Sequence, residues 1–308
     1  MDTHQHPQAV VVGVDGSVTA DLAVAWAAEY AGALRSPLRI VTAYPPDASA
    51  EEIRAATDDG RKAGTHALRL AWQHLDDAAR SATTALGPDL QLETVPVPGS
   101  PTSVLLDESQ RAAILVVGSR RLGRVHRVFS VSTGATSAAK AACPVVVVRE
   151  AVSRSLSGTR VVVGVEGPDS GSAAAFAFEQ AHRFGAGLTA VHSWTLNSAD
   201  LGSLVSPQAQ RQRLQTRSQA LLDEVLTPLA AAYPDVDVRR YVVEGSAPER
   251  LVELSENARL LVVGSRGLSP LSAMVLGSVS REVVAHAHCP VAVIHARSAR
   301  RPTALAQS

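Results

Sequence analysis

The chain has 308 residues, of which 46% are hydrophobic and only 4% aromatic, and its formal net charge is zero. At roughly 100–200 residues per domain, this length predicts two domains. Zero net charge offers no general attraction to nucleic acid or to an anionic membrane, and no apolar run reaches the ~18 residues that cross a bilayer. Residues 1–7 are polar and lack the apolar core of a signal peptide, so we expect a cytoplasmic protein without nucleic acid or membrane as partner.

Short Val-rich runs alternate with Ala- and Leu-rich helical segments along the whole chain. The strands predicted in the first half are Val10–Gly13, Leu38–Ala43, Gln91–Val97, Ile114–Val117 and Pro144–Val148. Those predicted in the second half are Val161–Gly164, Leu188–Ser193, Val236–Val243, Leu260–Val263 and Pro290–Ile294. The first helix is expected around Asp21–Tyr30, with Ser17 or Thr19 as its N-cap. Strands that alternate with helices predict a parallel sheet with right-handed crossovers in each half.

The two halves are copies of each other. The segment that begins Ile114-Leu-Val-Val-Gly-Ser-Arg returns as Leu260-Leu-Val-Val-Gly-Ser-Arg, 146 residues later, and Cys143 returns as Cys289 at the same offset. A repeat of this length exceeds the roughly 20–50 residues of a solenoid unit, so it indicates a duplicated domain. We expect a first domain over residues 1–150, a linker over 151–159, a second domain over 160–296 and a disordered tail over 297–308.

The last strand of each half carries no charge that would guard an exposed sheet edge. Pro144–Val148 and Pro290–Ile294 are apolar, and an unguarded edge favours pairing with another strand. A proline at the start of such a strand costs little, because that position need not donate to the ladder. We therefore expect the two halves to pack through their last strands as a pseudo-two-fold pair within one chain.

The two cysteines are most simply interpreted as small buried apolar residues. Cys143 and Cys289 both stand directly before a proline and a last strand, which suits free thiols in a cytosolic protein better than a disulfide. His286 and His288 with Cys289 form the one compact set of potential metal ligands in the sequence. The first half has no histidine at the equivalent positions before Cys143, and a helix end favours histidine in any case, so we expect no metal site.

The loop after the fourth strand of the second half carries the clearest ligand-binding pattern. Gly264, Gly267 and Gly277 form a Gly-x2-Gly-x9-Gly-Ser motif beyond the carboxyl end of a parallel strand, where ligands bind in open sheets. We expect these glycines to adopt positive φ and to let the backbone approach a phosphate. The helix that opens with residues 277–280 adds N–H groups and a dipole that favour anionic oxygens.

The combination of Val10-Val-Val-Gly-Val-Asp-Gly-Ser17, the Gly-x2-Gly-x9-Gly-Ser motif and the closing Cys-Pro-Val runs resembles the universal stress protein family, in particular its tandem, ATP-binding type found in actinobacteria. The resemblance covers both halves. It implies two tandem Rossmann-like domains of the adenine nucleotide alpha hydrolase type, each with a five-stranded parallel sheet flanked by helices. It also implies an acidic residue near the nucleotide, backbone contacts from the second strand to adenine, and a glycine loop around ribose and phosphates.

Carried over residue by residue, the resemblance gives a candidate ATP site in each half, with Mg²⁺ as an optional companion of the phosphates. In the first half the candidate residues are Gly13, Asp15, Val41, Gly118, Arg120 and Ser132. In the second half they are Gly164, Glu166, Val191, Gly264, Ser265, Arg266, Gly267, Gly277, Ser278, Val279 and Ser280. The first half departs from the motif, since Arg121 and Val131 replace two of its glycines. The second half departs at Pro168, where the first half has Ser17.

Phosphate-binding loops without a nucleophile–base pair or a catalytic carboxylate pair predict a stress-response regulator or sensor and not an efficient enzyme. Slow ATP hydrolysis is compatible with this interpretation, as are a homodimer and a regulatory protein partner. Two alternatives stay open: an interaction module without ligand, and an enzyme that uses an adenine nucleotide. The second lacks its usual signatures, since the chain has no Walker A motif and no Gly-x-Gly-x2-Gly after the first strand.

Overall fold

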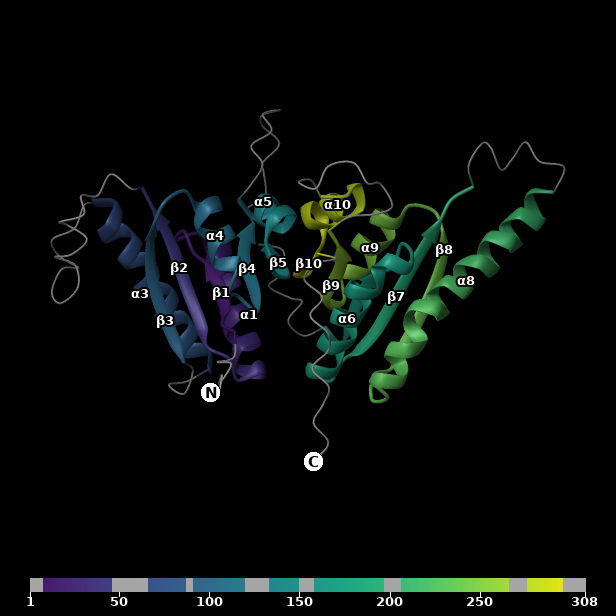
Figure 1. The fold of residues 1–308 in the computed structure, drawn as a ribbon, viewed down its shortest axis with the longest axis horizontal. Coiled ribbons are helices and arrows are strands. Elements are labelled where there is room, and N and C mark those ends of the chain that lie inside the picture. Colours follow the sequence, from purple (N-terminus) through teal and green to yellow (C-terminus); the bar gives the residue numbers. More distant parts are fainter. Residues whose placement is uncertain are drawn as a thin grey trace, which may run out of the picture.

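The computed structural model describes residues 8–45, 66–86, 91–119, 133–149, 158–196, 206–265 and 276–295. Figure 1 shows two similar halves joined by a single sheet. The first half contains β1 (Val10–Gly13), α1 (Val18–Leu34), β2 (Leu38–Tyr44), α3 (His66–Leu86), β3 (Leu92–Pro98), α4 (Pro101–Ser109), β4 (Ile114–Ser119), α5 (Thr133–Lys140) and β5 (Val145–Arg149). Of the predicted linker 151–159, residues 151–157 lie outside the described residues. The predicted tail 297–308 lies outside them entirely.

The second half repeats this order with one added turn after its first strand. It contains β6 (Arg160–Gly164), a 3₁₀ turn at Pro168–Ser170, α6 (Gly171–Arg183), β7 (Gly187–Trp194), α8 (Pro207–Ala232), β8 (Val238–Glu244), α9 (Ala247–Ser255), β9 (Ala258–Gly264), α10 (Ser278–His286) and β10 (Val291–Ile294). Every predicted strand is present, and its ends lie within two residues of the expected ones. The predicted fold class is confirmed.

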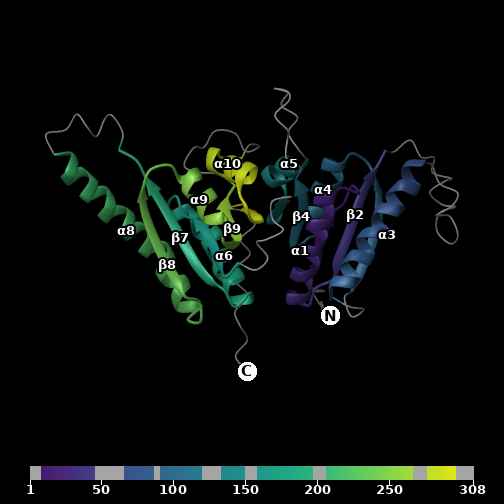
Figure 2. The same cartoon turned by 180° about the vertical axis from the view of Figure 1, so that it is seen from behind.

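The strands form one ten-stranded sheet in the order β3-β2-β1-β4-β5-β10-β9-β6-β7-β8. Within each half all neighbouring strands are parallel. Helices α1, α3, α6 and α8 pack against one face of the sheet, and α4, α5, α9 and α10 pack against the other. Strands β3 and β8 lie at the two outer edges (Figures 1 and 2). The Val-rich strands are buried because helices cover both faces, as in other parallel sheets.

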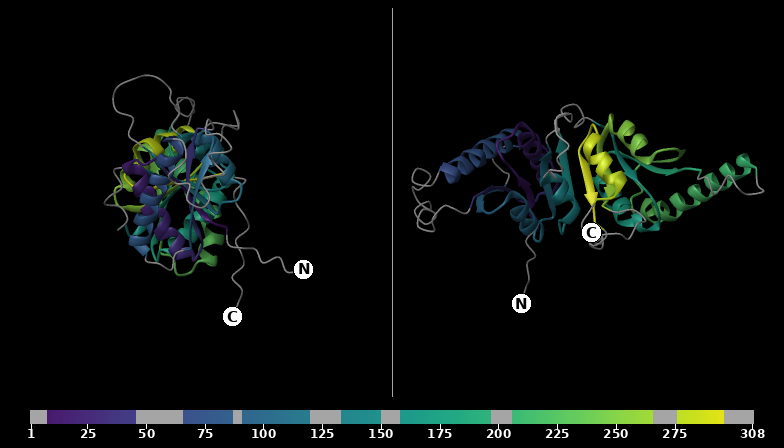
Figure 3. Two further views of the ribbon diagram at one scale, coloured as in Figure 1. Left: turned by 90° about the vertical axis from the view of Figure 1, so that its left-hand side faces the viewer. Right: turned by 90° about the horizontal axis from the view of Figure 1, so that it is seen from above.

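The two halves meet through their last strands, as the sequence predicts. Strand β10 pairs antiparallel with β5, with Ala292 opposite Val146. These two residues are equivalent in the repeat, since 292 minus 146 equals the repeat offset of 146. The pseudo-two-fold axis therefore passes through this pair, and the register is symmetric about it. Figure 3 shows β10 at the middle of the molecule, where the two halves join.

Contacts between α1 and the second half add to the junction. The ring of Tyr30 meets that of Phe184 edge-on, with the centroids 6.3 Å apart, and Tyr30 also stacks on Trp26. The guanidinium of Arg259 lies 4.5 Å from the centroid of Phe184 and forms an ion pair with Glu29. Such an aromatic pair with a cation over it, here partly buried, stabilises the association of the halves by about 1–2 kcal/mol beyond area burial.

The smaller expectations about local structure can also be checked. Ser17, not Thr19, is the N-cap of α1, and its hydroxyl accepts a hydrogen bond from the N–H of Ala20. Cys143 and Cys289 are free and buried, as expected, and burial raises the pKa of the Cys143 thiol to about 12. No helix in the described part of the chain is long and apolar enough to cross a membrane.

Candidate functional site

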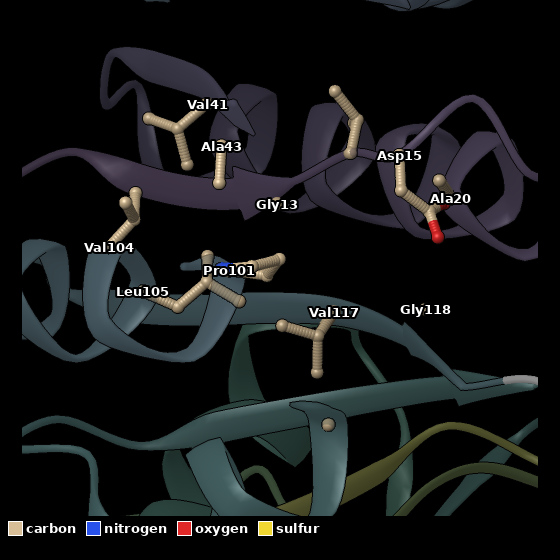
Figure 4. Close-up of a pocket in the computed structure, with 12 residues that line it drawn as sticks. Gly13, Asp15, Ala20, Val41, Ala43, Pro101, Val104, Leu105, Val117 and Gly118 are labelled. Atoms are coloured by element: carbon tan, nitrogen blue, oxygen red, sulfur yellow. The ribbon is translucent and has the colours of Figure 1, made fainter. Parts of the chain in front are cut away.

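A pocket opens beyond the carboxyl ends of β1 and β4, the place that the sequence predicts for a ligand (Figure 4). Its walls come from the ends of β1, β2 and β4, the loop after β1, and the first turns of α1, α4 and α5. The lining residues are Gly13, Val14, Asp15, Ala20, Val41, Ala43, Pro101, Val104, Leu105, Val117, Gly118 and Gly134. The described residues enclose about 130 Å³, less than the roughly 300–1,000 Å³ of sites for drug-sized ligands. Residues 120–132, which follow β4, lie outside the described residues.

The pocket is apolar inside and carries one carboxylate. The side chains of Val41, Val104, Leu105 and Val117 face it, and Asp15 lies beside Ala20 (Figure 4). Among the twelve described lining residues, Asp15 is the one ionisable side chain. This arrangement suits a flat, largely apolar group held inside, with a hydrogen-bond donor directed at Asp15.

The loop after β1 is shaped by the residues that follow Asp15. The carboxylate of Asp15 accepts hydrogen bonds from the backbone N–H of Ser17, at 3.1 Å, and from its hydroxyl. Gly16 has φ of 71°, a left-handed conformation that favours glycine. Its Cα also lies so close to the ring of His74 that an added Cβ would be 2.3 Å from Nε2. The loop is thus held from both sides, and Asp15 stays at the surface beside the pocket.

The second half forms the equivalent loop with different residues. The hydroxyl of Ser170 accepts hydrogen bonds from the N–H groups of Glu166, at 3.0 Å, and Gly167, at 3.3 Å. Pro168 opens a 3₁₀ turn there, and α6 begins only at Gly171. The departure at Pro168 thus moves the start of the helix, and Ser170 takes over the organisation of the loop.

The second strand of each half holds this loop by a pair of hydrogen bonds. The carbonyl oxygens of Val41 and Val191 accept from the N–H groups of Val14 and Val165, both at 2.9 Å. In the reverse direction, the hydroxyl of Thr42 donates to the carbonyl of Val14 at 2.5 Å. His192, the equivalent of Thr42, donates through Nδ1 to the carbonyl of Val165 at 2.8 Å. The sequence analysis missed Thr42 and His192, although a polar residue at the same position of a buried strand in both halves is a usable signal.

The glycines of the candidate loops do not have the backbone conformation that we expected. None of Gly118, Gly264 and Gly277 is among the described residues with positive φ, and Gly277 has φ of −57° and ψ of 158°, an extended conformation open to any residue. The prediction of positive φ is therefore wrong at Gly264 and Gly277, and Gly267 lies outside the described residues. Gly118 is needed for a different reason: an added Cβ would lie 2.6 Å from the carbonyl oxygen of Thr19, at the start of α1.

Several hydrogen-bonding groups of the second glycine loop are used inside the protein. The hydroxyl of Ser280 donates to the carbonyl of Gly264 at 2.5 Å and is buried. Ser265 is also buried; its N–H donates to Ile294, and its carbonyl accepts from Gly277 at 3.0 Å. The N–H groups of Ser278, Val279 and Ser280 belong to the first turn of α10, where no intrahelical acceptor exists. A helix end offers an anion N–H groups of this kind, whereas the hydroxyl of Ser280 is already used inside the protein.

Four candidate residues, Arg120, Ser132, Arg266 and Gly267, lie outside the described residues, as do Arg121 and Val131. Gly13 lines the pocket, and Gly164, at the end of β6, takes the same position in the second half. Within the described ranges, no three His, Cys, Asp or Glu side chains come together as a metal site. The Nδ1 of His286 instead lies 3.0 Å from a carboxylate oxygen of Glu282 on the same helix.

Both halves match one protein family. Residues 7–149 and residues 158–295 match the model of the universal stress protein family. The chain belongs to the universal stress protein family. It is 34% identical to universal stress protein Rv2005c of Mycobacterium tuberculosis strain H37Rv over 297 residues, which cover 92% of this chain and 96% of that one.

Other members of the family are similar over nearly the whole length. Universal stress protein Rv1996 of the same strain is 33% identical over 310 residues, covering 95% of this chain and 96% of its own. The crystal structure of a universal stress protein from Archaeoglobus fulgidus DSM 4304 aligns with 93% of this chain and 96% of its own, with a TM-score of 0.63 and 17% identity. At that identity the likeness bears on the fold alone.

Proposed function

We propose that this universal stress protein binds ATP and acts as a stress-response regulator or sensor without efficient catalysis. The observation that carries the proposal is the pocket of the first half beyond β1 and β4, with its apolar walls and the carboxylate of Asp15, and the second half repeats the elements that form it. An adenine ring is flat and largely apolar on its faces, which suits Val41, Leu105 and Val117. Ribose hydroxyls donate hydrogen bonds, and Asp15 is an acceptor within the pocket.

The second half offers the better site for phosphates. The first-turn N–H groups of Ser278, Val279 and Ser280 and the dipole of α10 favour anionic oxygens. Gly277 precedes them without a side chain, which leaves room for a phosphate to approach. The acidic position in this half is Glu166, whose N–H is already bound by Ser170. We therefore propose that the C-terminal half holds ATP with its phosphates over Gly264–Gly267 and residues 277–280, with Mg²⁺ as the usual companion of the phosphates.

The chemistry of the described pocket supports binding and not turnover. General acid–base catalysis needs a titratable side chain in reach of the reacting group, and nucleophilic catalysis needs a nucleophile beside a base. Asp15 alone supplies neither pair. A bound nucleotide in such a site acts through the shape it gives the protein, which a regulatory partner could then recognise.

Mass spectrometry of the freshly purified, denatured chain tests the proposal directly. We expect released adenine nucleotide, with ATP as the main species. Protein that releases no nucleotide and binds none when ATP is added would instead support the interaction module without ligand. Steady release of pyrophosphate with an added substrate would support the adenine-nucleotide enzyme.

The substitution Gly277→Val tests the placement of the phosphates. Because φ of Gly277 is −57°, valine fits the backbone, and the variant should fold as the parent does. Its side chain would crowd the first-turn N–H groups, so we expect ATP affinity to fall by about tenfold, or ~1.4 kcal/mol. Val131→Gly, the opposite exchange at the equivalent position of the first half, is the matched control and should not weaken binding. Unchanged affinity in folded Gly277→Val would contradict the placement.

A further inference from the structure

The two outer strands of the sheet, β3 and β8, are equivalent in the repeat, but their exposed edges differ. At one end of β3 the carbonyl of Gln91 accepts from Leu38, and at the other end the N–H of Gly99 donates to Tyr44. Odd-numbered residues of β3 therefore direct their backbone groups toward β2. Because backbone groups alternate along a strand, the even-numbered residues direct theirs outward.

Strand β8 has the same arrangement. The carbonyl of Asp237 accepts from Leu188 at one end, and the N–H of Gly245 donates to Trp194 at the other. The residues whose N–H and C=O groups point outward are Val238, Arg240, Val242 and Glu244. Among the described residues, no further strand pairs with this edge.

Prolines close the edge of β3 but not that of β8. Pro96 and Pro98 are both even-numbered, so the N–H groups that they lack are outward-facing ones. The equivalent residues of β8 are Val242 and Glu244, 146 positions later, which keep their N–H groups. Proline on an outward position is a known protection of sheet edges against pairing, and β3 has it twice. The duplicated domain thus carries one blunted edge and one open edge.

The side chains of β8 include an exposed aromatic ring and charges that already have partners. Tyr241 is 43% exposed, and it is one of three large apolar side chains with such exposure among the described residues. The charged side chains of β8 have partners: Arg240 pairs with Asp223 of α8, Glu244 pairs with Arg211 of α8, and Arg239 lies 3.8 Å from a carboxylate oxygen of Asp237. A strand that pairs with this edge therefore meets few charges without partners.

We infer that β8 pairs antiparallel with β8 of a second copy of this chain, with the two-fold axis at Tyr241. In this register the outward residues face each other, Arg240 opposite Val242 and Val238 opposite Glu244, so every outward N–H group of both strands has an acceptor. Arg239 faces Val243, and no like charges are opposed. Tyr241 faces its own copy at a position without ladder hydrogen bonds, where side chains of paired strands lie closest.

The same prolines favour a two-fold dimer through β8 over a head-to-tail assembly in which β8 pairs with β3. Pairing of β8 with β3 of another molecule would repeat without end and build a filament. Pro96 and Pro98 remove two of the donors that this contact needs, whereas β8 with β8 loses none. The contact between two β8 strands uses the same patch on both molecules, so it closes as a dimer.

Sedimentation equilibrium of the full chain tests the inference. We expect two chains per particle for the parent and one for Val242→Pro, which places a proline where β3 carries Pro96. Val242→Thr, which keeps the N–H group, is the matched control and should remain a dimer. Circular dichroism checks that both variants fold. A parent that stays a single chain at ~100 μM, or a dimer that survives Val242→Pro, would overturn the inference.

A cross-linking variant tests the register independently of proline. Cα atoms of opposed residues without ladder bonds are about 4.5 Å apart, within the range of a disulfide. Tyr241→Cys should therefore form a covalent dimer under mild oxidation, and the native cysteines do not compete because both are buried. In Arg239→Cys the two new thiols would lie on opposite sides of the axis, four residues apart in register, and no cross-link is expected. Cross-linking of both variants or of neither contradicts this register.

Discussion

At the scale of single residues, the glycines of the site serve close packing and not unusual backbone angles. Gly118, near the end of β4, packs directly against the first turn of α1. A Cβ at this position would lie 2.6 Å from the carbonyl oxygen and 2.7 Å from the carbonyl carbon of Thr19. These are backbone atoms of a helix, which cannot move aside as a flexible side chain would. The short distance between β4 and α1 also shapes the floor of the pocket, which Gly118 and Ala20 both line.

The substitution Gly118→Ala should therefore destabilise the first half. Crowding of this kind in a packed region costs about 1–3 kcal/mol. Gly134→Ala is the matched control, because its Cβ would have no neighbour nearer than 3.6 Å among the described residues. As a helical residue in α5, alanine there should be neutral or stabilise the protein by up to about 1 kcal/mol. Urea unfolding measures both; equal stability of the two variants would contradict the packing role of Gly118.

The same residues show what the sequence can and cannot predict about the site. The spacing of Gly118, Gly264 and Gly277 located the loops at the carboxyl edge of the sheet, because glycines after parallel strands mark tight turns. It could not distinguish positive φ from close approach, since the atoms that approach Gly118 belong to α1, far away in the sequence. Nor could it show that the hydroxyl of Ser280 is directed at Gly264 and buried, because that depends on how α10 docks on β9.

At the scale of elements, strand positions were predicted well and helix starts less well. The Val-rich strands are short, apolar and bounded by glycine or proline, so their ends were predicted within two residues. The start of α6 depends on Pro168 and on the two hydrogen bonds that Ser170 accepts. Helix propensities do not reveal this difference from α1, which begins directly after its N-cap Ser17. In α1 the cap Ser17 links the helix to the pocket, because its hydroxyl also donates to Asp15.

The substitution Ser17→Ala should have two effects. Loss of the N-cap lowers the free energy of unfolding by about 1 kcal/mol, and the freed carboxylate of Asp15 changes nucleotide affinity if the first half binds the nucleotide. Ser206→Ala is the matched control, because Ser206 caps α8 through Ala209 at the same distance of 3.3 Å, outside the pocket. It should lower stability equally and leave affinity unchanged. Chemical unfolding measures the stability, and titration with ATP measures the affinity. Equal affinity changes in both variants would contradict a role of Ser17 in nucleotide binding.

At the scale of the whole molecule, the junction joins two copies of one domain into a single sheet with continuous helix layers. The pair Val146–Ala292 lies on the pseudo-two-fold axis, and both residues are fully buried. Around it, Tyr30 and Phe184 meet across the halves, and burial is the main reason why the pKa of Tyr30 is raised. The paired segments, residues 145–147 and 291–293, carry no charge, so the folded state depends on the halves staying together.

The substitution Val146→Asp should loosen this junction. It places a carboxylate at a fully buried position opposite Ala292, among apolar side chains that cannot pair with a charge. An unpaired buried charge costs several kcal/mol. Val146→Ala is the control for lost volume alone; it should cost about 1–3 kcal/mol and keep the halves joined. Thermal unfolding should show a lower midpoint for Val146→Asp, and limited proteolysis should release the two halves as separate fragments. A Val146→Asp variant that is as stable as the parent and is cleaved in the same pattern would mean that β5 and β10 do not hold the halves together in solution.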